Sequence, residues 1–380
     1  MRQSRRGQVD PFIVMDVMER ARQAECAGRS VIHMEVGQPS TPAPAVARQA
    51  LAGALDQPLG YTVALGMPEL RAAIAGLYRR WYGVDLDPAR VIVTPGSSGA
   101  FLLAFSALFD AGDRVAVGEP GYPSYRQILR AMSVEPVGMQ TRAENRYQPV
   151  PSDIPADVQG VMLASPGNPS GTMLTRDALA ALADRTAEIG AALISDEIYH
   201  GLSYGERCVS ALEITDEVVV INSFSKYFSM TGWRIGWLVV PPSMIRTMER
   251  LAANMFICAP HASQVAALAA LTPEADAEAQ ENLAIYAENR RLMLDRLPAI
   301  GFDRIAPPDG AFYVYADVSD LTDDSAALAA DILDRAGVAV TPGIDFDPVR
   351  GATTLRFSYA RSTPEIAEAL DRLAAYMAAR

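Results

Sequence analysis

Lys226 is the only lysine in a chain of 380 residues, and arginine fills the other 32 of its 33 basic positions. Either side chain supplies positive charge, but only a primary amine condenses with a carbonyl group to form a Schiff base. The neighbouring residues, from Ser223 to Phe228, are rich in hydroxyl and aromatic groups, as a buried amine beside a polar ligand requires. We therefore predict a covalent role for Lys226, with an incidental surface lysine as the alternative.

Two further groups that could bind a ligand follow apolar runs earlier in the chain. After residues 90–94 a helix begins, and its free backbone N–H groups, with the hydroxyls of Ser97 and Ser98, would bind an anion such as phosphate. After residues 114–118 comes Tyr122, whose aromatic ring would lie at the same edge of a sheet. The alternatives are an ordinary strand–helix connection for the first feature and ordinary packing for the second.

Charged and polar side chains also stand where the apolar pattern predicts a core. Asp196 directly follows the apolar run 191–195, and a buried acid is costly unless it meets a cation. A protonated pyridine nitrogen would be such a cation. Arg234 begins another apolar run, and a phosphate is a natural partner for its guanidinium. Asn168 is displayed by a rigid turn of proline and glycine.

The elements that carry these residues predict an α/β fold. Short apolar runs alternate along the chain with helical stretches such as 99–109, 122–132 and 175–189. Strands that are apolar on both faces and alternate with helices form a mostly parallel sheet covered by helices on both faces. Ligands bind beyond the carboxyl ends of such strands. The predicted strands are 90–94, 114–118, 134–139, 159–164, 191–195, 217–222 and 235–240.

The two ends of the chain predict a smaller α+β domain. Asp10-Pro11 has the character of a helix start, and this helix is expected to pack with the C-terminal unit. Thr41-Pro42 and Pro68 would open further helices, and residues 260–297 predict a long alanine-rich helical region. The remaining predicted elements are strands 31–36, 302–306, 311–317, 338–341 and 353–358 and helices 325–336 and 363–379. The expected domains are 1–44 with 286–380 (small) and 45–285 (large).

The composition excludes several classes of protein. A net charge of −12 and a pI near 4.8 argue against a nucleic-acid partner. The mean hydropathy is near zero and no uninterrupted apolar run of about 18 residues occurs, which argues against a membrane span. No apolar signal core follows the first residues, so we expect a soluble cytoplasmic protein. The scattered cysteines (Cys26, Cys208 and Cys258) and three histidines predict neither disulfides nor a metal site.

The predicted strand ends bring an amine, an acid, an arginine, hydroxyls, an anion-binding turn and an aromatic ring to one edge of the sheet. Each feature has an ordinary structural explanation of its own. A planar phosphorylated aldehyde with a basic ring nitrogen would use all of them at once. Pyridoxal 5′-phosphate is such a molecule, and we predict it as the cofactor.

With these residues in place, the chain resembles the class I/II aminotransferases, the fold-type-I group of pyridoxal-phosphate enzymes, over nearly all of its length. The most specific segment is Ser223 to Trp237, SFSKYFSMTGWRIGW. One position departs from the family pattern, because Ser170 stands where threonine is usual. The other segments that carry the resemblance are Tyr61-Thr62, Gly66 to Arg71, Ser165 to Thr172, Ser195 to Tyr199 and Leu355 to Ala360.

The resemblance implies roles for residues around the cofactor ring. Lys226 would hold the cofactor as an internal aldimine, and Asp196 would keep the ring nitrogen protonated. Tyr199 and Asn168 would form hydrogen bonds with the ring oxygen. Tyr122 would stack on the face of the ring.

The resemblance also implies contacts at the two anionic ends of the ligands. Arg356 would bind the substrate α-carboxylate as a bidentate pair, with Gly37 beside it. Tyr61 would reach the cofactor phosphate of a neighbouring subunit, since family members are homodimers with shared active sites. The phosphate would otherwise be held by Ser97, Ser98, Ser223 and Arg234.

The implied activity is transfer of an amino group between an α-amino acid and a 2-oxo acid by a ping-pong mechanism, with Lys226 as general base. A carbon–sulfur β-lyase on the same scaffold is the alternative. A non-enzymatic hypothesis is a cofactor-sensing regulatory module, which the acidic composition disfavours. Phe12, Ile13 and Val14 are expected to line the side-chain pocket in part, with residues 254–258 nearby, and would favour apolar or aromatic substrates over dicarboxylates.

Overall fold

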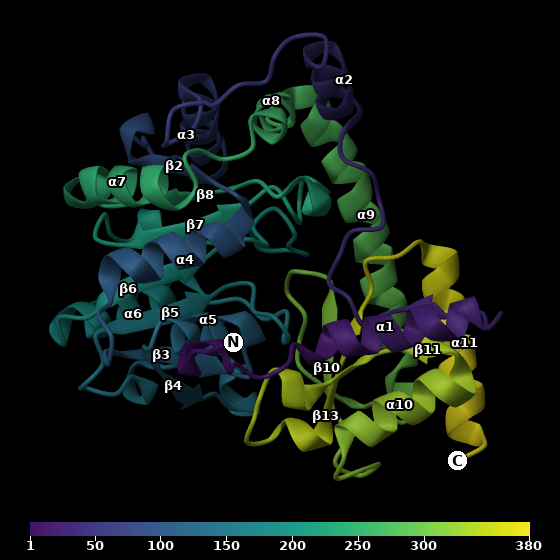
Figure 1. The fold of residues 1–380 in the computed structure, drawn as a ribbon. Coiled ribbons are helices and arrows are strands. Elements are labelled where there is room, and N and C mark those ends of the chain that lie inside the picture. The colour runs from purple at the N-terminus through teal and green to yellow at the C-terminus, as the bar shows by residue number, and fades with distance from the viewer.

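The computed structural model describes residues 1–380, which form a large and a small domain side by side (Figure 1). The large domain is built on a seven-stranded sheet in which β8 alone is antiparallel to its neighbours. The predicted mostly parallel sheet is therefore confirmed. In spatial order its strands are β2 (Val91–Thr94), β8 (Gly236–Val239), β7 (Val219–Ser223), β6 (Ala192–Asp196), β5 (Gly160–Ala164), β3 (Arg114–Glu119) and β4 (Glu135–Gln140).

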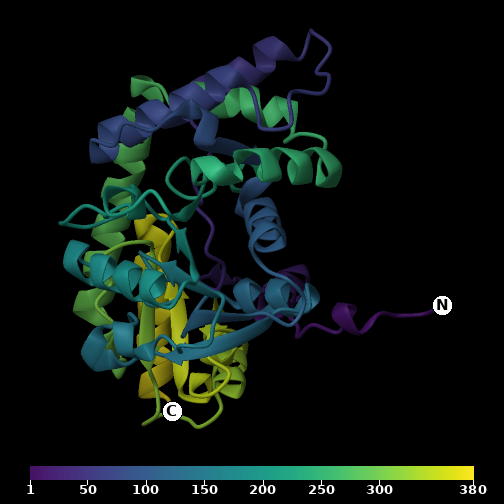
Figure 2. The ribbon, with the colours of Figure 1, turned by 90° about the vertical axis from the view of Figure 1, so that its left-hand side faces the viewer.

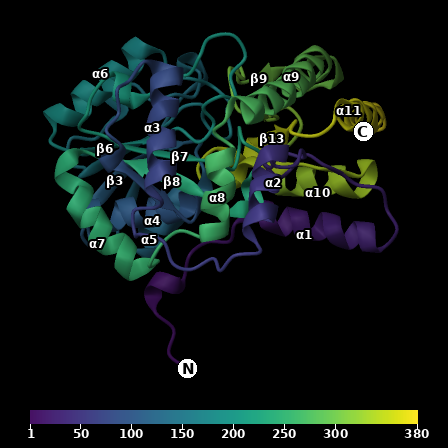
Figure 3. The same ribbon diagram turned by 90° about the horizontal axis from the view of Figure 1, so that it is seen from above.

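Helices cover this sheet on both faces. Three of them pack together on one face, namely α4 (Gly96–Leu108), α5 (Pro123–Ala131) and α7 (Ile245–Met255), while α6 (Arg176–Glu188) lies on the other (Figure 3). The helix predicted to open at Pro68 is α3 (Pro68–Tyr82), which packs against β2 and α8 (His261–Ala269). No helix of the structure combines the length and the apolar character that crossing a bilayer requires.

The small domain joins the two ends of the chain, as predicted. Its antiparallel sheet has the order β12 (Thr341–Pro342), β13 (Thr354–Ser358), β10 (Tyr313–Asp317) and β9 (Arg304–Ile305). The N-terminal strand β1 (Ile32–His33) pairs in parallel with β11 (Val338–Ala339), and α1 (Ile13–Cys26) packs on β11 and β12. Helices α10 (Ser325–Ala336) and α11 (Thr363–Ala378) complete the domain. The residues before α1 contact α5, and the N-terminus itself projects away from the rest of the molecule (Figure 2).

Three helix boundaries differ from the sequence-based expectation. The first helix begins at Ile13 rather than at Asp10-Pro11, because the Asp10 carboxylate is bound by Arg130 and Gln127 instead of capping the helix. The helix expected at Thr41-Pro42 is α2 (Ala45–Ala54), which starts after Pro44. The alanine-rich region is split into α8 and α9 (Pro273–Arg296) at Thr272, whose hydroxyl caps α9.

Candidate active site

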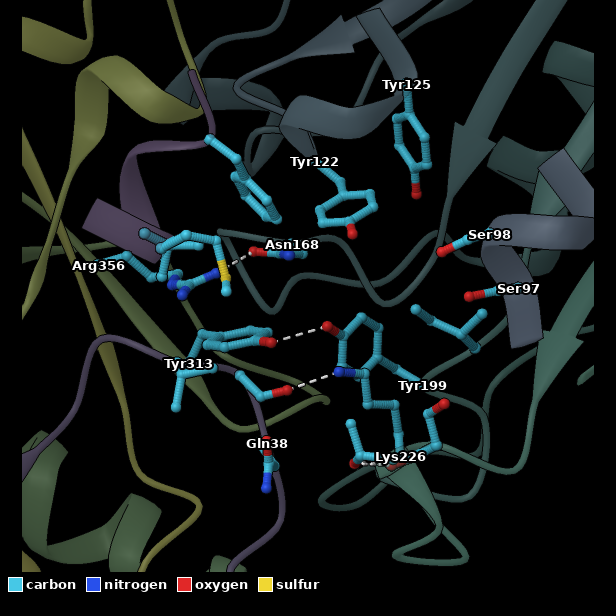
Figure 4. A pocket seen from close by; sticks show the side chains of 18 of the residues that line it. Gln38, Ser97, Ser98, Tyr122, Tyr125, Asn168, Tyr199, Lys226, Tyr313 and Arg356 are labelled. Atoms are coloured by element: carbon cyan, nitrogen blue, oxygen red, sulfur yellow. Dashed lines mark hydrogen bonds between the residues drawn. The ribbon is translucent and has the colours of Figure 1, made fainter. Parts of the chain in front are cut away.

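A cavity of about 190 Å³ lies where the carboxyl ends of the large-domain strands meet the small domain (Figure 4). Its position agrees with the ligand-binding edge of an open α/β sheet. Side chains from both domains and from the N-terminal segment line it. Of the twelve predicted site residues, nine line this cavity: Gly37, Ser97, Ser98, Tyr122, Asn168, Tyr199, Lys226, Arg234 and Arg356.

Lys226 follows β7 and is half-buried, with its amine turned into the cavity. Its Nζ donates a hydrogen bond to the Gly37 carbonyl oxygen at 2.5 Å. Burial lowers the pKa of Lys226 to about 8, and the guanidinium groups of Arg356 and Arg234 act in the same direction. The alternative of an incidental surface lysine is therefore wrong. An amine with this pKa is partly neutral, and thus nucleophilic, near neutral pH.

Asp196 ends β6 and is buried behind the cavity lining, with a side chain 2% exposed. One carboxylate oxygen accepts a hydrogen bond from the Tyr125 hydroxyl, and the other accepts one from the Ile198 N–H at 3.1 Å. Burial raises the pKa of Asp196 to about 6, although both hydrogen bonds and Lys226 oppose the rise. Asp196 makes no ion pair, so a buried acid at this place still lacks a cationic partner.

The start of α4 and Arg234 together form an anion-binding corner. The first N–H groups of α4, including those of Ser97 and Ser98, have no intrahelical acceptor. Arg234 forms no ion pair and donates to the Thr231 carbonyl at 2.9 Å. A Cβ on Gly96 would lie 2.5 Å from Nη2 of Arg234, so only glycine lets the guanidinium come this close to the helix start.

Three of the predicted residues, Asp196, Ser223 and Tyr61, do not line this cavity. Ser223 was predicted to bind phosphate, but its buried hydroxyl lies 2.9 Å from Oγ of Ser225 and 3.2 Å from the Ile235 carbonyl, and it does not line the cavity. Ser225, which the sequence analysis missed, lines it instead. Asp196 is buried and is not a lining residue, and Tyr61 is 82% exposed in the segment between α2 and α3.

The tyrosines of the site form a connected aromatic group. The Tyr199 hydroxyl lies 2.7 Å from that of Tyr313, which the sequence analysis did not single out (Figure 4). The Tyr122 ring meets the edge of Phe12 with ring centroids 5.9 Å apart, and it meets Tyr125 at 5.3 Å. Tyr125 follows Tyr122 by three residues at the start of α5, so a helical spacing could have revealed that both rings face the cavity.

Arg356 lies on β13 and is 3% exposed, so it is a buried residue and not a surface arginine. Its guanidinium donates to Oδ1 of Asn168 at 2.8 Å and to the Glu35 carbonyl. The guanidinium carbon lies 4.4 Å from the ring centroid of Tyr313 and 4.6 Å from that of Phe346. No carboxylate pairs with it, and its buried Nε has no hydrogen-bond partner. This group is arranged to bind an anion that the chain itself does not supply.

The site is strongly positive in a chain whose net charge is −12. Lys226, Arg234 and Arg356 all line the cavity, and none of them forms an ion pair with an acidic side chain. Two arginines at separate ends of one cavity suit a ligand set with two anionic groups, such as a phosphate and a carboxylate.

The N-terminal segment forms an apolar wall of the cavity. Phe12 and Val14 line the cavity as predicted. Ile13 does not line it, whereas Met15 does. Gln38 also lines the cavity and was not predicted. Residues 254–258, which we expected nearby, do not line it.

Comparisons with known proteins agree over nearly the whole chain. Residues 29–373 match the family model described as aminotransferase class I and II. A valine–pyruvate aminotransferase of Mycobacterium tuberculosis is 49% identical over 98% of this chain and 97% of its own. An aspartate aminotransferase of Pyrococcus horikoshii is 31% identical over 95% and 93% of the two chains. Among solved structures, a putative aminotransferase from Silicibacter pomeroyi has a TM-score of 0.96 with 66% identity, and an aminotransferase from Mycobacterium tuberculosis has a TM-score of 0.98 with 48% identity; each covers 100% of both chains.

Proposed function

The chain belongs to the class I and II aminotransferases, and from this premise we propose that it uses pyridoxal 5′-phosphate to move an amino group between an α-amino acid and a 2-oxo acid. One observation carries the proposal. The single lysine of the chain, with its pKa lowered to about 8, lies in a cavity with two arginines that have no acidic partners. Aminotransferase chemistry needs these groups, namely an amine that forms a Schiff base and cations for a phosphate and a carboxylate.

The residues present fit this cofactor. The free N–H groups at the start of α4, the hydroxyls of Ser97 and Ser98 and the Arg234 guanidinium would hold its phosphate. Asp196, a buried acid without a cationic partner, would pair with the protonated ring nitrogen. Tyr122 would stack on the ring, while Asn168 and Tyr199 would contact the ring oxygen.

When bound, pyridoxal 5′-phosphate supplies an aldehyde that condenses with amines and a cationic ring that withdraws electrons from the carbon bearing the amine. Lys226 would hold it covalently through Nζ in the resting enzyme. With the substrate in the site, the neutral Nζ of Lys226 would remove the proton from the substrate Cα, since a neutral amine beside that carbon is a suitable general base. We propose ping-pong kinetics, because the enzyme would retain the amino group between release of the first oxo acid and binding of the second.

Arg356 would orient the substrate for this proton transfer. Its unpartnered Nε and the fixed positions of its terminal nitrogens suit a planar carboxylate. The relatives named above are aminotransferases, which favours transfer over the β-lyase alternative.

We propose an α-amino acid with an apolar side chain as the donor. Phe12, Val14 and Met15 line the cavity, and no basic side chain of this chain other than Lys226, Arg234 and Arg356 does so. A second carboxylate would thus lack a cation from the same subunit. The relative named as a valine–pyruvate aminotransferase supports the same choice, while the aspartate aminotransferase makes aspartate the comparison substrate.

We also propose that the active form is a homodimer that shares its sites. Tyr61, Val63, Met255 and Ile257 are exposed apolar side chains. They gather on one surface, because the N–H of Thr62 donates to Sγ of Cys258 at 3.4 Å. A dimer would cover this surface and bring Tyr61 to the cofactor phosphate of the other subunit.

The test is the visible absorption spectrum of the purified protein with added cofactor, recorded before and after single amino acids. Under the proposal, a visible band bleaches with valine and returns with pyruvate, while aspartate has little effect. Pyruvate and ammonia released from a thioether amino acid, with the band unchanged, would support the lyase instead. A protein that develops no band with pyridoxal 5′-phosphate would contradict the proposed cofactor.

A further inference from the structure

The first turn of α1 is capped by a side chain from the other end of the sequence. The Asp345 carboxylate accepts hydrogen bonds from the N–H of Ile13 at 3.1 Å and from the N–H of Val14 at 3.2 Å. The N-cap residue, Phe12, has no polar side chain for this purpose. Since the first N–H groups of a helix need external acceptors, Asp345 fixes where α1 begins.

Asp345 is itself held by the large domain. The buried guanidinium of Arg126, on α5, donates to the carbonyl oxygens of Asp345 and Phe346, both at 3.0 Å. The N–H of Gly121 also donates to the Phe346 carbonyl at 3.0 Å. The turn that carries Asp345 is thus attached to the segment that leads into Tyr122.

The residues next to the capped N–H groups form the apolar wall of the cavity. Phe12 and Val14 flank Ile13, and both line the cavity together with Met15. The Phe12 ring contacts the ring of Tyr122, with ring centroids 5.9 Å apart. The contacts therefore link α5 through Asp345 to α1, and the ring of Phe12 links α1 back to Tyr122 at the start of α5.

We propose that Asp345 is a positioning residue for substrate selection, which sets the space for the substrate side chain by holding the start of α1. The inference rests on the proposed function, because it assigns the apolar wall to the side chain of the donor. A carboxylate suits this position because its two oxygens meet two N–H donors. Asparagine offers one acceptor and would turn its NH₂ group against the second N–H.

The test compares Asp345→Asn and Asp345→Ala with Thr175→Ala as a matched control. Thr175 caps α6 in the large domain by accepting a hydrogen bond from the Ala178 N–H at 3.2 Å, and it does not line the cavity. All three variants lose helix-capping contacts, but only the Asp345 variants release the apolar wall. The measurements are hydrogen exchange of the peptide that covers residues 12–18 in the unliganded protein, and kcat/KM for valine and for alanine with the cofactor bound.

Both Asp345 variants should exchange residues 12–18 faster, by about tenfold, and the ratio of kcat/KM for valine over alanine should fall by about tenfold, because valine presents two more carbon atoms to the wall. The control should leave both values near those of the wild type. Faster exchange with an unchanged valine-to-alanine ratio would overturn the inference, as would unchanged exchange. If the alanine variant does not fold, the asparagine variant, which keeps one acceptor, decides the question.

A failure of the proposed function can be told apart from a failure of the role proposed for Asp345. A wild-type protein that transaminates neither amino acid would contradict that function and the assignment of the wall to substrate selection. The exchange comparison needs no substrate, and it would still decide whether Asp345 holds the start of α1.

Discussion

The hydroxyl oxygens of Tyr199 and Tyr313 lie 2.7 Å apart, and their hydrogen bond joins the two domains at the cavity. Tyr199 follows β6 of the large domain, whereas Tyr313 begins β10 of the small domain. A hydroxyl group has one proton to donate. If Tyr199 donates that proton to a ligand in the cavity, Tyr313 must be the donor between the two tyrosines.

Tyr313→Phe should therefore lower kcat/KM by about tenfold, because Tyr199 loses the bond that orients its hydroxyl. Tyr315→Phe is the matched control. Tyr315 is a buried tyrosine of the same strand, but its hydroxyl bonds to Oγ1 of Thr354 at 2.7 Å and it does not line the cavity. Steady-state kinetics with one donor and one oxo acid measures both variants. Equal losses in the two would show that the effect is general to buried tyrosine hydroxyls of β10.

Lys226→Ala should reduce turnover by about 10⁴-fold or more, because in the proposed mechanism one side chain serves as both nucleophile and general base. Lys226→Arg should fare no better, since its charge remains but its nucleophilicity is lost. Circular dichroism and thermal unfolding should show the fold retained in Lys226→Ala, because the wild-type amine is already costly to bury in its charged form. Turnover in either variant would rule out the covalent role of Lys226.

The capture of added pyridoxal 5′-phosphate by the unliganded protein should depend on pH through Lys226. Only the neutral amine attacks an aldehyde, and burial lowers the pKa of Lys226 to about 8. The capture rate should rise about tenfold per pH unit below that value and level off above it. Stopped-flow measurement of the growing visible band gives the profile. A rate that keeps rising to pH 10 would indicate an amine with an ordinary pKa.

Arg356→Lys should lower kcat/KM by about 100-fold for both the amino acid and the oxo acid, mainly through KM. A lysine ammonium cannot replace the planar pair of donors that a carboxylate takes from a guanidinium. Arg361→Lys is the control, because Arg361 lies nearby outside the cavity and donates to the His33 carbonyl at 3.2 Å. A wild-type KM in Arg356→Lys would remove Arg356 from the carboxylate site.

Much of the fold could be predicted because its parallel strands are buried on both faces. Such strands read as uninterrupted apolar runs, and each of the seven predicted runs overlaps a strand of the large sheet. The site followed from the same pattern, since polar residues such as Asp196 and Arg234 stand where a run ends or begins. The hydroxyl of Ser223 turns toward Ser225 and Ile235 within the structure, a direction that the spacing of hydroxyls along the chain does not fix, and its predicted contact with the phosphate stays a prediction.

The parts that escaped prediction depend on contacts between distant segments. The start of α1 is set by Asp345, more than 300 positions later, so the local signal at Asp10-Pro11 gave the wrong boundary. The sequence around Tyr313 does not single it out, because the role proposed for it depends on its hydrogen bond to Tyr199 in the other domain. Local sequence patterns carry no information about such pairings until the topology is known.

The proposed sharing of sites between two subunits predicts how a mixture of two inactive variants behaves. Tyr61→Ala should weaken cofactor binding by about tenfold, since a hydrogen bond to the phosphate is lost. Tyr61 is 82% exposed within its own subunit, so its loss should leave the stability of the isolated subunit nearly unchanged. At a cofactor concentration that leaves Tyr61→Ala almost inactive, Lys226→Ala is inactive as well.

Reassociating these two variants should restore activity. In a hybrid dimer, one site combines an intact Lys226 with an intact Tyr61 from the other subunit, whereas the second site lacks both. Random pairing makes half of the dimers hybrids with one complete site each, so the mixture should recover about a quarter of the wild-type activity. Each variant reassociated with itself is the control. If the mixture forms dimers in sedimentation and stays inactive, Tyr61 serves its own subunit; if no dimers form, the exposed apolar surface around Tyr61 has some other role.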